Sequence, residues 1–451
     1  MKTSPALLGL VFLILASPSP RQAEGQSPSE APNASSAKIP AYGVVSGHVY
    51  LGDTKSPARN ATVYLQPTMS LRESGPSGRS NGEDSGLSIS IETAFDGSYS
   101  FPLVPYGSYY VTALQAGYVS PYTRLSIADG GSLSEAGESP GPEQKAARKR
   151  VLKSIPEVDV QSILPVNIDV VLERGGAING TVSYDDGTPA TGVQVSALIQ
   201  NPQAGKEPWI PFESVPAHMW DRIVTDDRGS YRISGLPAGK YIVVVKLSSI
   251  RSIRYISSHS TSSTGDNGTT SSLTIFSGNT PRLKDASSFS IALGEERSGE
   301  DIQIPMSKLH TVSGNFVSAL DGHMVNAGMA VLSNADDKSF VSEANATKDN
   351  PGFTFYLVCE GDYILSSSMS ADVDFVEVAA SNSDVPMPPP YESRPRHFYG
   401  AVSIPIHVGG DMHDVTIAVP EPNAKEAQMF KAMQQQMEQQ QQQQNPSGAP
   451  R

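Results

Sequence analysis

The sequence predicts an all-β protein of three tandem, small antiparallel β-sandwich modules (transthyretin-like), followed by a C-terminal glutamine-rich helix or tail. Three observations lead to this fold class: an internal repeat, a two-residue hydrophobic period, and turn residues where helical connections would otherwise stand. The repeat opens with Gly47-His48-Val49, which returns as Gly180-Thr181-Val182 and as Gly314-Asn315-Phe316. The spacings are 133 residues, from 47 to 180, and 134 residues, from 180 to 314. Self-similarity at a fixed period indicates one folding unit used several times.

A second signature follows each opening after a variable loop. In the first two copies it consists of Thr93, Gly97, Tyr99 and Tyr109, then of Thr225, Gly229, Tyr231 and Tyr241. The third copy reads Thr347, Gly352, Thr354 and Tyr363, and its first aromatic is displaced to Phe353 or Phe355. The repeat therefore extends well beyond the opening glycine.

The strands are predicted from alternation. In the second copy, apolar residues occupy every other position over 178–184, 193–199 and 241–247, and this period of two indicates half-buried strands. Asp185-Asp186-Gly187 and Asp226-Asp227-Arg228-Gly229 separate such strands, and both are turn sequences. Without a helical crossover between the strands, we expect hairpin connections and antiparallel pairing throughout.

The chain divides into six predicted segments. Residues 1–25 are a signal peptide and residues 26–40 a flexible linker rich in Ser, Pro and Ala. Module 1 spans 41–172 with an inserted loop near 128–157, module 2 spans 173–307, module 3 spans 308–420, and 421–451 forms the glutamine-rich tail. In the tail, Ala427, Phe430, Met433 and Met437 fall at helical spacing. This segment is expected either to self-associate or dock on another helix, or to form a frayed, exposed tail, and the frayed tail is favoured.

The pattern of residues at the N-terminus indicates an exported protein. Lys2, the apolar stretch 6–16 and Ala23-Glu24-Gly25 have the layout of a secretory signal, and about 11 apolar residues are too few to span a bilayer. We expect no transmembrane segment once the signal is removed. The single cysteine, Cys359, is interpreted as a core residue at a strand end.

The net charge of −13 argues against nucleic acid as a partner. One segment departs from this acidic balance: residues 144–151 inside the inserted loop of module 1 form a short basic helix candidate. A solvated surface helix is favoured there over a contact with an anionic surface.

Module 2 resembles the carboxypeptidase regulatory-like domains. It carries Gly187-Thr188-Pro189, the run 225–233 (Thr-Asp-Asp-Arg-Gly-Ser-Tyr-Arg-Ile) and Gly235-Leu236-Pro237-Ala238-Gly239-Lys240-Tyr241. Module 1 matches less completely and module 3 least, because Val325 replaces the proline there. The resemblance implies a transthyretin-like sandwich, grouped with carbohydrate-binding-like folds and frequent in exported bacterial proteins. It identifies a fold and not an activity.

The signature residues also have a purely structural interpretation. We expect Gly229 and Gly239 in turns, Pro237 stiffening the approach to the last strand, and Tyr241 burying its ring while its hydroxyl reaches a backbone group. The remaining residues assigned to this scaffold are Gly47, Gly97, Tyr109, Gly180, Tyr231, Gly314, Gly352 and Tyr363.

No catalytic motif is found in the sequence, so we predict no enzymatic activity, no cofactor and no metal site. The His-x-x-Glu pair of metallocarboxypeptidases is missing, and the nearest sequence, His218-Met219-Trp220-Asp221, has no assignable third ligand. Calcium binding by Asp185, Asp186, Asp226 and Asp227 stays open, although these residues stand where turns favour aspartate.

Two candidate binding regions remain. Trp209, Phe212 and Trp220 lie in a loop, 205–222, inserted only in module 2, and flat rings of this kind can stack on sugars. Tyr391, Arg394 and Arg396 lie in a proline-rich segment, 386–399, suited either to partner recognition or to service as a rigid linker.

These observations predict a non-catalytic binding or scaffold protein of the bacterial cell envelope. Its expected partners are a polysaccharide or envelope glycan and envelope proteins, and its expected location is periplasmic, envelope-associated or extracellular. Two alternatives are an accessory subunit of an outer-membrane transport or receptor system and a metallopeptidase-like enzyme with an unrecognised site.

Overall fold

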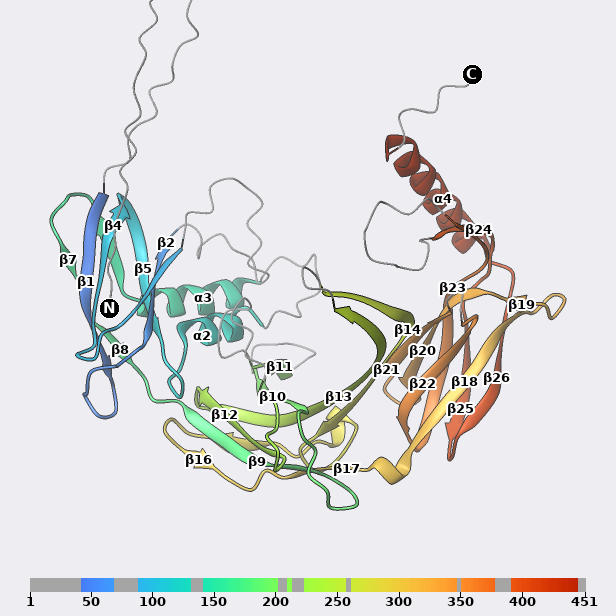
Figure 1. Ribbon diagram of the computed structural model, residues 1–451, viewed down its shortest axis with the longest axis horizontal. Helices are drawn as coiled ribbons and strands as arrows, with labels where there is room; N and C mark the ends of the chain where they lie inside the picture. The colour runs from blue at the N-terminus through green and yellow to red at the C-terminus, as the bar shows by residue number, and fades with distance from the viewer. Residues whose placement is uncertain are drawn as a thin grey trace, which may run out of the picture. The chain divides into compact units, whose positions relative to one another are not determined.

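The computed structural model describes residues 42–68, 88–130, 141–201, 209–212, 223–256, 261–346, 350–377 and 391–444 (Figure 1). The predicted signal peptide and linker, residues 1–40, lie outside these ranges. The described strands form six sheets, two for each copy of the repeat. The protein is thus mostly β and contains several β-sandwiches, as the period-two alternation predicts.

Module 1 pairs two four-stranded sheets, with the strand orders β4-β1-β7 (with β8 also on β1) and β3-β2-β5-β6. Its strands are β1 (Tyr42–Leu51), β2 (Thr62–Pro67), β3 (Ile89–Glu92), β4 (Ser98–Pro105), β5 (Gly107–Leu114), β6 (Glu157–Val160), β7 (Val166–Asn167) and β8 (Val170–Leu172).

Module 2 repeats this plan with the orders β12-β9-β16 (with β17 on β9) and β11-β10-β13-β14 (with β15 on β13). Its strands are β9 (Gly176–Tyr184), β10 (Gln194–Gln200), β11 (Trp209–Pro211), β12 (Ser230–Leu236), β13 (Gly239–Ile256), β14 (Thr261–Phe276), β15 (Phe289–Ile291), β16 (Glu296–Arg297) and β17 (Ile302–Ile304). Two short 3-10 helices, η1 (Leu283–Asp285) and η2 (Met306–Lys308), flank its last strands.

Module 3 has the orders β19-β18-β22 (with β26 on β18) and β21-β20-β23-β24 (with β25 on β23). Its strands are β18 (Leu309–Ser318), β19 (Met324–Val325), β20 (Ala327–Asn334), β21 (Phe340–Ala346), β22 (Gly352–Cys359), β23 (Gly361–Glu377), β24 (Tyr391–Phe398), β25 (Val402–Val408) and β26 (Met412–Val419).

The expectation of purely antiparallel sheets is wrong. In every module the closing strand pairs parallel to the first strand: β7 and β8 with β1, β16 and β17 with β9, and β26 with β18. The hairpin rule applies to neighbours within one sheet. Here the strand before the closing strand belongs to the opposite sheet of the sandwich. A short loop that crosses from one sheet to the other can therefore bring the closing strand parallel to the first strand, without the helix that a parallel connection within one sheet needs.

The described hydrophobic residues pack in three main clusters, which lie within 45–172, 178–304 and 312–419. Alternation explains the burial, since β1 reads exposed, buried, half-buried, buried along most of its length. The fully buried residues of each cluster come from one copy of the repeat.

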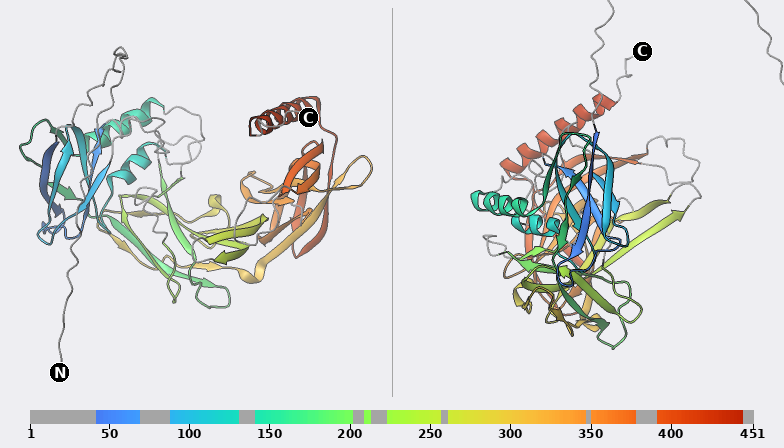
Figure 2. Two further views of the ribbon diagram at one scale, coloured as in Figure 1. Left: turned by 45° about the horizontal axis from the view of Figure 1, so that its top comes forward. Right: turned by 90° about the vertical axis from the view of Figure 1, so that its left-hand side faces the viewer.

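Within the described ranges, three α-helices accompany the sheets. In module 1, α2 (Pro121–Ala128) and α3 (Pro142–Ser154) lie side by side (Figure 2). The second of these contains the basic segment 144–151 that the sequence predicts to be helical. After module 3 comes α4 (Ala424–Gln444). None of the helices in the described ranges is long and apolar enough to cross a bilayer.

The glutamine-rich helix packs against the sheet of module 3. The Phe430 ring stacks on Phe398 at the end of β24, with ring centroids 4.7 Å apart, and Ala371 and Val373 complete the small apolar cluster. The Glu426 carboxylate also accepts the backbone N–H of Asn423 at 2.9 Å, which caps the start of the helix. The expectation of a frayed, exposed tail is thus wrong for the first half of this helix, which docks on a sheet and not on another helix, with Met433 partly buried in the same cluster.

Candidate functional site

The tyrosine and threonine residues of the repeated signature form hydrogen bonds to backbone groups. In each module a tyrosine hydroxyl donates to the carbonyl oxygen four residues earlier: Tyr109 to Pro105 at 2.9 Å, Tyr241 to Pro237 at 2.6 Å and Tyr363 to Cys359 at 2.8 Å. Thr225 Oγ1 donates to the Ala190 carbonyl and accepts the Val193 N–H at 2.9 Å, and Thr93 makes the same pair of bonds in module 1. These contacts hold turns and strand ends together.

The opening glycine gives the closing segment room. A Cβ added to Gly47, Gly180 or Gly314 would lie 1.8, 2.3 or 1.9 Å from a backbone carbonyl oxygen of the closing segment, at Ile168, Glu300 or Val415. The aromatic facing this glycine across the sheet is Tyr99, Tyr231 or Phe353, which settles the third copy in favour of Phe353.

Gly229 and Gly239, both predicted to lie in turns, differ in backbone conformation. Gly229, like Gly97, has a positive φ, of 75°, and its N–H donates to the Asp226 carbonyl in a turn. Gly239 instead begins β13 as a paired strand residue, and its added Cβ would meet the Ile199 side chain at 3.0 Å. Space rather than backbone conformation favours glycine there.

The aromatic residues of module 2 occupy different environments. Trp209 lies in β11, a short edge strand paired with β10, so the expectation of an irregular loop is wrong at this point. Ile210, which is 4% exposed, anchors the strand in the core. The Phe212 ring meets the Tyr241 ring edge-on at 6.3 Å and packs against the core, whereas Trp209 is half-buried. Trp220 lies outside the described residues.

The predicted partner-binding residues lie on a strand and not in a stiff proline-rich segment. Residues 391–398 form β24, which pairs antiparallel with the far half of β23. Pro395 is tolerated because β24 ends its sheet, where a missing N–H breaks no further ladder. Arg394 and Arg396 are exposed, and the Arg396 guanidinium is 3.4 Å from the Asp374 carboxylate.

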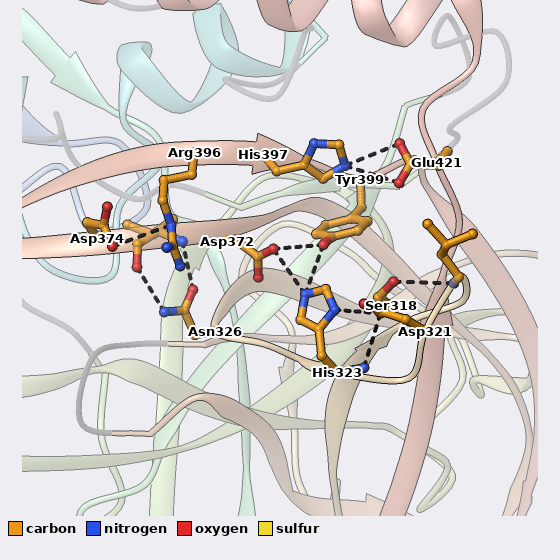
Figure 3. A network of polar contacts seen from close by, with 12 residues as sticks. Ser318, Asp321, His323, Asn326, Asp372, Asp374, Arg396, His397, Tyr399 and Glu421 are labelled. Atoms are coloured by element: carbon orange, nitrogen blue, oxygen red, sulfur yellow. Dashed lines mark hydrogen bonds and ion pairs between the residues drawn. The ribbon is translucent and has the colours of Figure 1, made fainter.

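Next to β24 lies a polar network that the sequence analysis missed (Figure 3). His323, in the hairpin between β18 and β19, stands between two carboxylates. Its Nδ1 is 2.5 Å from Asp321 Oδ1, and its Nε2 is 3.1 Å from Asp372 Oδ2 on β23. The Tyr399 hydroxyl donates to the same Asp372 oxygen at 2.7 Å and lies 3.1 Å from His323 Nε2.

The network ties the hairpin to the sheet at an irregularity. The register of β23 against β24 shifts between Asp372 and Val373. The Asn326 side chain accepts the Val373 N–H and donates to the Val373 carbonyl, both at 2.8 Å, so it replaces a missing strand partner. Beyond Tyr399, His397 Nε2 is 3.2 Å from the Glu421 carboxylate, just before α4.

The charge of this network depends on whether the His323 ring is protonated. Hydrogen bonds to Asp321 and then Asp372 raise the pKa of His323, and the pKa of Asp321 is lowered in return. Burial, followed by the hydrogen bond to Asp372, raises the pKa of Tyr399, which keeps its hydroxyl protonated. A protonated His323 donates to both carboxylates, whereas the neutral ring can donate to one of them only.

Module 3 is rich in such pairs. Five of the eight histidines fall within 308–420. His310 lies 3.6 Å from Glu360 and 3.7 Å from Asp411, and His407 lies 2.7 Å from Asp362. The crowding of histidines into one module is the signal by which the sequence could have pointed to this region.

The aspartates weighed as calcium ligands are engaged in turns. Asp226 Oδ1 accepts the N–H groups of Arg228 and Ser230, and Asp186 Oδ1 accepts that of Thr188. Within the described ranges, no group of three or more His, Cys, Asp or Glu side chains is placed to hold a metal ion. At the end of β22, burial raises the pKa of Cys359 to about 11, so its thiol is held protonated.

Comparison with known proteins leaves the family open. No known family profile matches this chain, and no curated protein matches it. Among solved structures, the TIE protein of Bacillus anthracis is 14% identical, with a TM-score of 0.18; the match covers 84% of this chain but only 51% of TIE.

Two further structural matches are as distant. A streptococcal ancillary pilin is 11% identical over 85% of this chain and 99% of its own, with a TM-score of 0.25. A candidate carbohydrate binding protein from Pseudomonas aeruginosa is 14% identical over 29% of this chain and 89% of its own, with a TM-score of 0.17. With TM-scores this low, these likenesses carry no argument about the function of this chain.

Proposed function

We propose that this chain is an exported, non-catalytic binding or scaffold protein of the bacterial cell envelope, built from three carboxypeptidase regulatory-like sandwiches. One observation carries the proposal: the repeated residues are used by the scaffold itself. Their hydroxyls bond backbone carbonyls, and their glycines admit the closing segment. The repeat therefore supplies a rigid frame, and the features that differ between modules are left to bind.

The first binding surface in this proposal is the β11 region of module 2, with an envelope glycan as ligand. Trp209 supports it, because its ring is half-buried on an edge strand and so keeps a face for stacking on a sugar. Trp220 is proposed as a second stacking ring from its place in the sequence. Contacts of this kind are individually weak, and repeated sites on a polymer would add to them.

A binding screen against envelope polysaccharides tests this surface. We expect the double variant Trp209→Ala and Trp220→Ala to lose retention on the bound glycan while its thermal unfolding stays unchanged. Phe212→Ala is the matched control, since this ring packs on Tyr241 and its removal should lower stability instead. Retention of the double variant equal to that of wild type would exclude the tryptophans.

The second surface is the outer edge of β24, proposed to contact an envelope protein. Arg394 and Arg396 are exposed on this strand, which ends its sheet, and Pro395 between them opposes strand addition, so the proposed contact is made through the arginine side chains. Tyr391 is the third residue of this proposal. Crosslinking from position 394 in intact cells tests it: a single captured envelope protein is expected, and capture equal to that from position 228, an exposed arginine of module 2, would contradict it.

A further inference from the structure

The outward face of α3 concentrates positive charge in an acidic protein. Of its thirteen residues, Lys145, Arg148, Lys149, Arg150 and Lys153 are basic, and Glu143 alone is acidic. The whole chain carries 46 acidic against 33 basic residues. Such a reversal within one inserted helix calls for a reason beyond solubility.

One of the five basic residues is used in packing. Arg148 pairs with Asp129 at the end of α2, and the two side chains are only 17% and 12% exposed. Burial raises the pKa of Asp129, and the neighbouring guanidinium partly offsets this rise. Val151 and Leu152 pack on the same side, against a cluster of Tyr110, Leu125 and Ile155. This face holds α3 on module 1.

The other four basic residues follow a stretch of the helix surface that begins beside this packed face and continues around the helix. At 100° per residue, Lys145, Lys149, Arg150 and Lys153 fall within an arc of roughly 140° and along about 12 Å of helix. All four are exposed, and the ion pairs found among the described residues include none of them. Glu143 sits in the first turn, where it complements the helix dipole.

We propose that this face of α3 binds the surface of a bilayer that contains anionic phospholipids. A flat stripe of four flexible cations fits a plane of phosphate headgroups. The only other helix residue within the arc besides Pro142 is Ala146, so the contact is electrostatic, without apolar insertion and without a ring that could stack on a sugar. At physiological salt, charges beyond about 8 Å are screened, so the distant acidic residues do not cancel the stripe.

Vesicle binding by the full-length mature protein tests the proposal. The probe is a vesicle of phosphatidylglycerol mixed with phosphatidylcholine, compared with pure phosphatidylcholine. The variant replaces Lys145, Lys149, Arg150 and Lys153 with Gln, which keeps helix propensity and leaves the Arg148 pair intact. The control replaces four other exposed basic residues with Gln, namely Arg228, Lys246, Lys308 and Lys425.

Each basic residue near an anionic surface is expected to change partitioning roughly fivefold, so the α3 variant should bind at least ~100-fold more weakly, and added salt should abolish binding of the wild type. The control variant should bind like wild type, and circular dichroism should show both variants folded. Equal binding to neutral vesicles, an equal loss in the control variant, or retention on an acidic polysaccharide without vesicle binding would each overturn the proposal. Because α3 belongs to module 1, the result is independent of the glycan surface proposed for module 2.

Discussion

Replacing Gly180 with alanine tests the role of the residue that opens the repeat. A Cβ at this position would lie 2.3 Å from the Glu300 carbonyl oxygen and 3.1 Å from the Tyr231 hydroxyl. Contacts of a Cβ below 3.0 Å essentially do not occur, so β9 and the 300–301 segment would have to separate by at least about 0.7 Å. The contacts below 3.0 Å are with the backbone of Glu300, which cannot move aside as the end of a flexible side chain can.

The separation also strains hydrogen bonds that close module 2. The Tyr231 hydroxyl donates to the Glu300 carbonyl, and Asp301 accepts the Thr181 N–H at 2.8 Å. Overpacking costs about 1–3 kcal/mol, and each hydrogen bond that breaks adds about 1 kcal/mol. We therefore expect a loss of about 3–5 kcal/mol in the free energy of unfolding of module 2, and a melting temperature lower by roughly 10–20 °C.

Tryptophan fluorescence is the assay, because both tryptophans of the chain, at 209 and 220, belong to module 2 by sequence. Gly299→Ala is the matched control: it lies in the same closing segment with open space around it, and only its φ of 81° is unfavourable for alanine. It should cost about 1–2 kcal/mol. If Gly180→Ala were no more destabilising than Gly299→Ala, the close approach would not be the reason for this glycine.

Three further predictions concern single side chains. Tyr241→Phe removes a buried hydroxyl that bonds a carbonyl, so it should lower the free energy of unfolding by about 1 kcal/mol, whereas Tyr106→Phe, on an exposed ring, should change nothing measurable by urea unfolding. Because the folded-state pKa of His323 is raised above its unfolded value of about 6.5, its stabilisation is fully present below that pH and is lost as the pH rises through the folded pKa. The gap in unfolding midpoint between wild type and His323→Gln should therefore be larger at about pH 6 than at about pH 8.5, and an equal gap would rule out the proton's role. Phe430→Ala should detach α4 and reduce its helicity in circular dichroism, because most of the stability of a helix in a protein comes from packing of its apolar face, while Met429→Ala, at an exposed position, should leave the helicity as it is.

Local rules were enough to predict much of the scaffold. The alternation over 193–199 predicted β10, and Asp226 to Gly229 formed the expected turn. The start of β13 was also predicted as a strand, but residues 241–245 are all buried and not half-buried as expected. The basic segment of module 1 was predicted as a helix and forms most of α3. These features depend on residues close together in the chain, where backbone preferences and side-chain period act directly.

The polar network of module 3 could not be predicted in the same way. Asp321 and His323 are two residues apart in sequence, but Asp372 and Tyr399 are 49 and 76 residues from His323. Their meeting depends on the pairing of β23 with β24 and on the bulge that turns Asp372 toward the hairpin. Likewise, the docking of Phe430 required the position of Phe398.

The amino-acid order alone determined the number of repeats, the period of the strands and the residues that shape the turns, because each of these is set by neighbours along the chain. The tertiary structure decided that the closing strands run parallel to the opening ones, that Trp209 lies on an edge strand, and that four basic side chains of α3 are left exposed while Arg148 is mostly buried. The physical reason is that a crossing between two sheets and the burial of one helix face depend on packing between residues far apart in sequence, which no local pattern records.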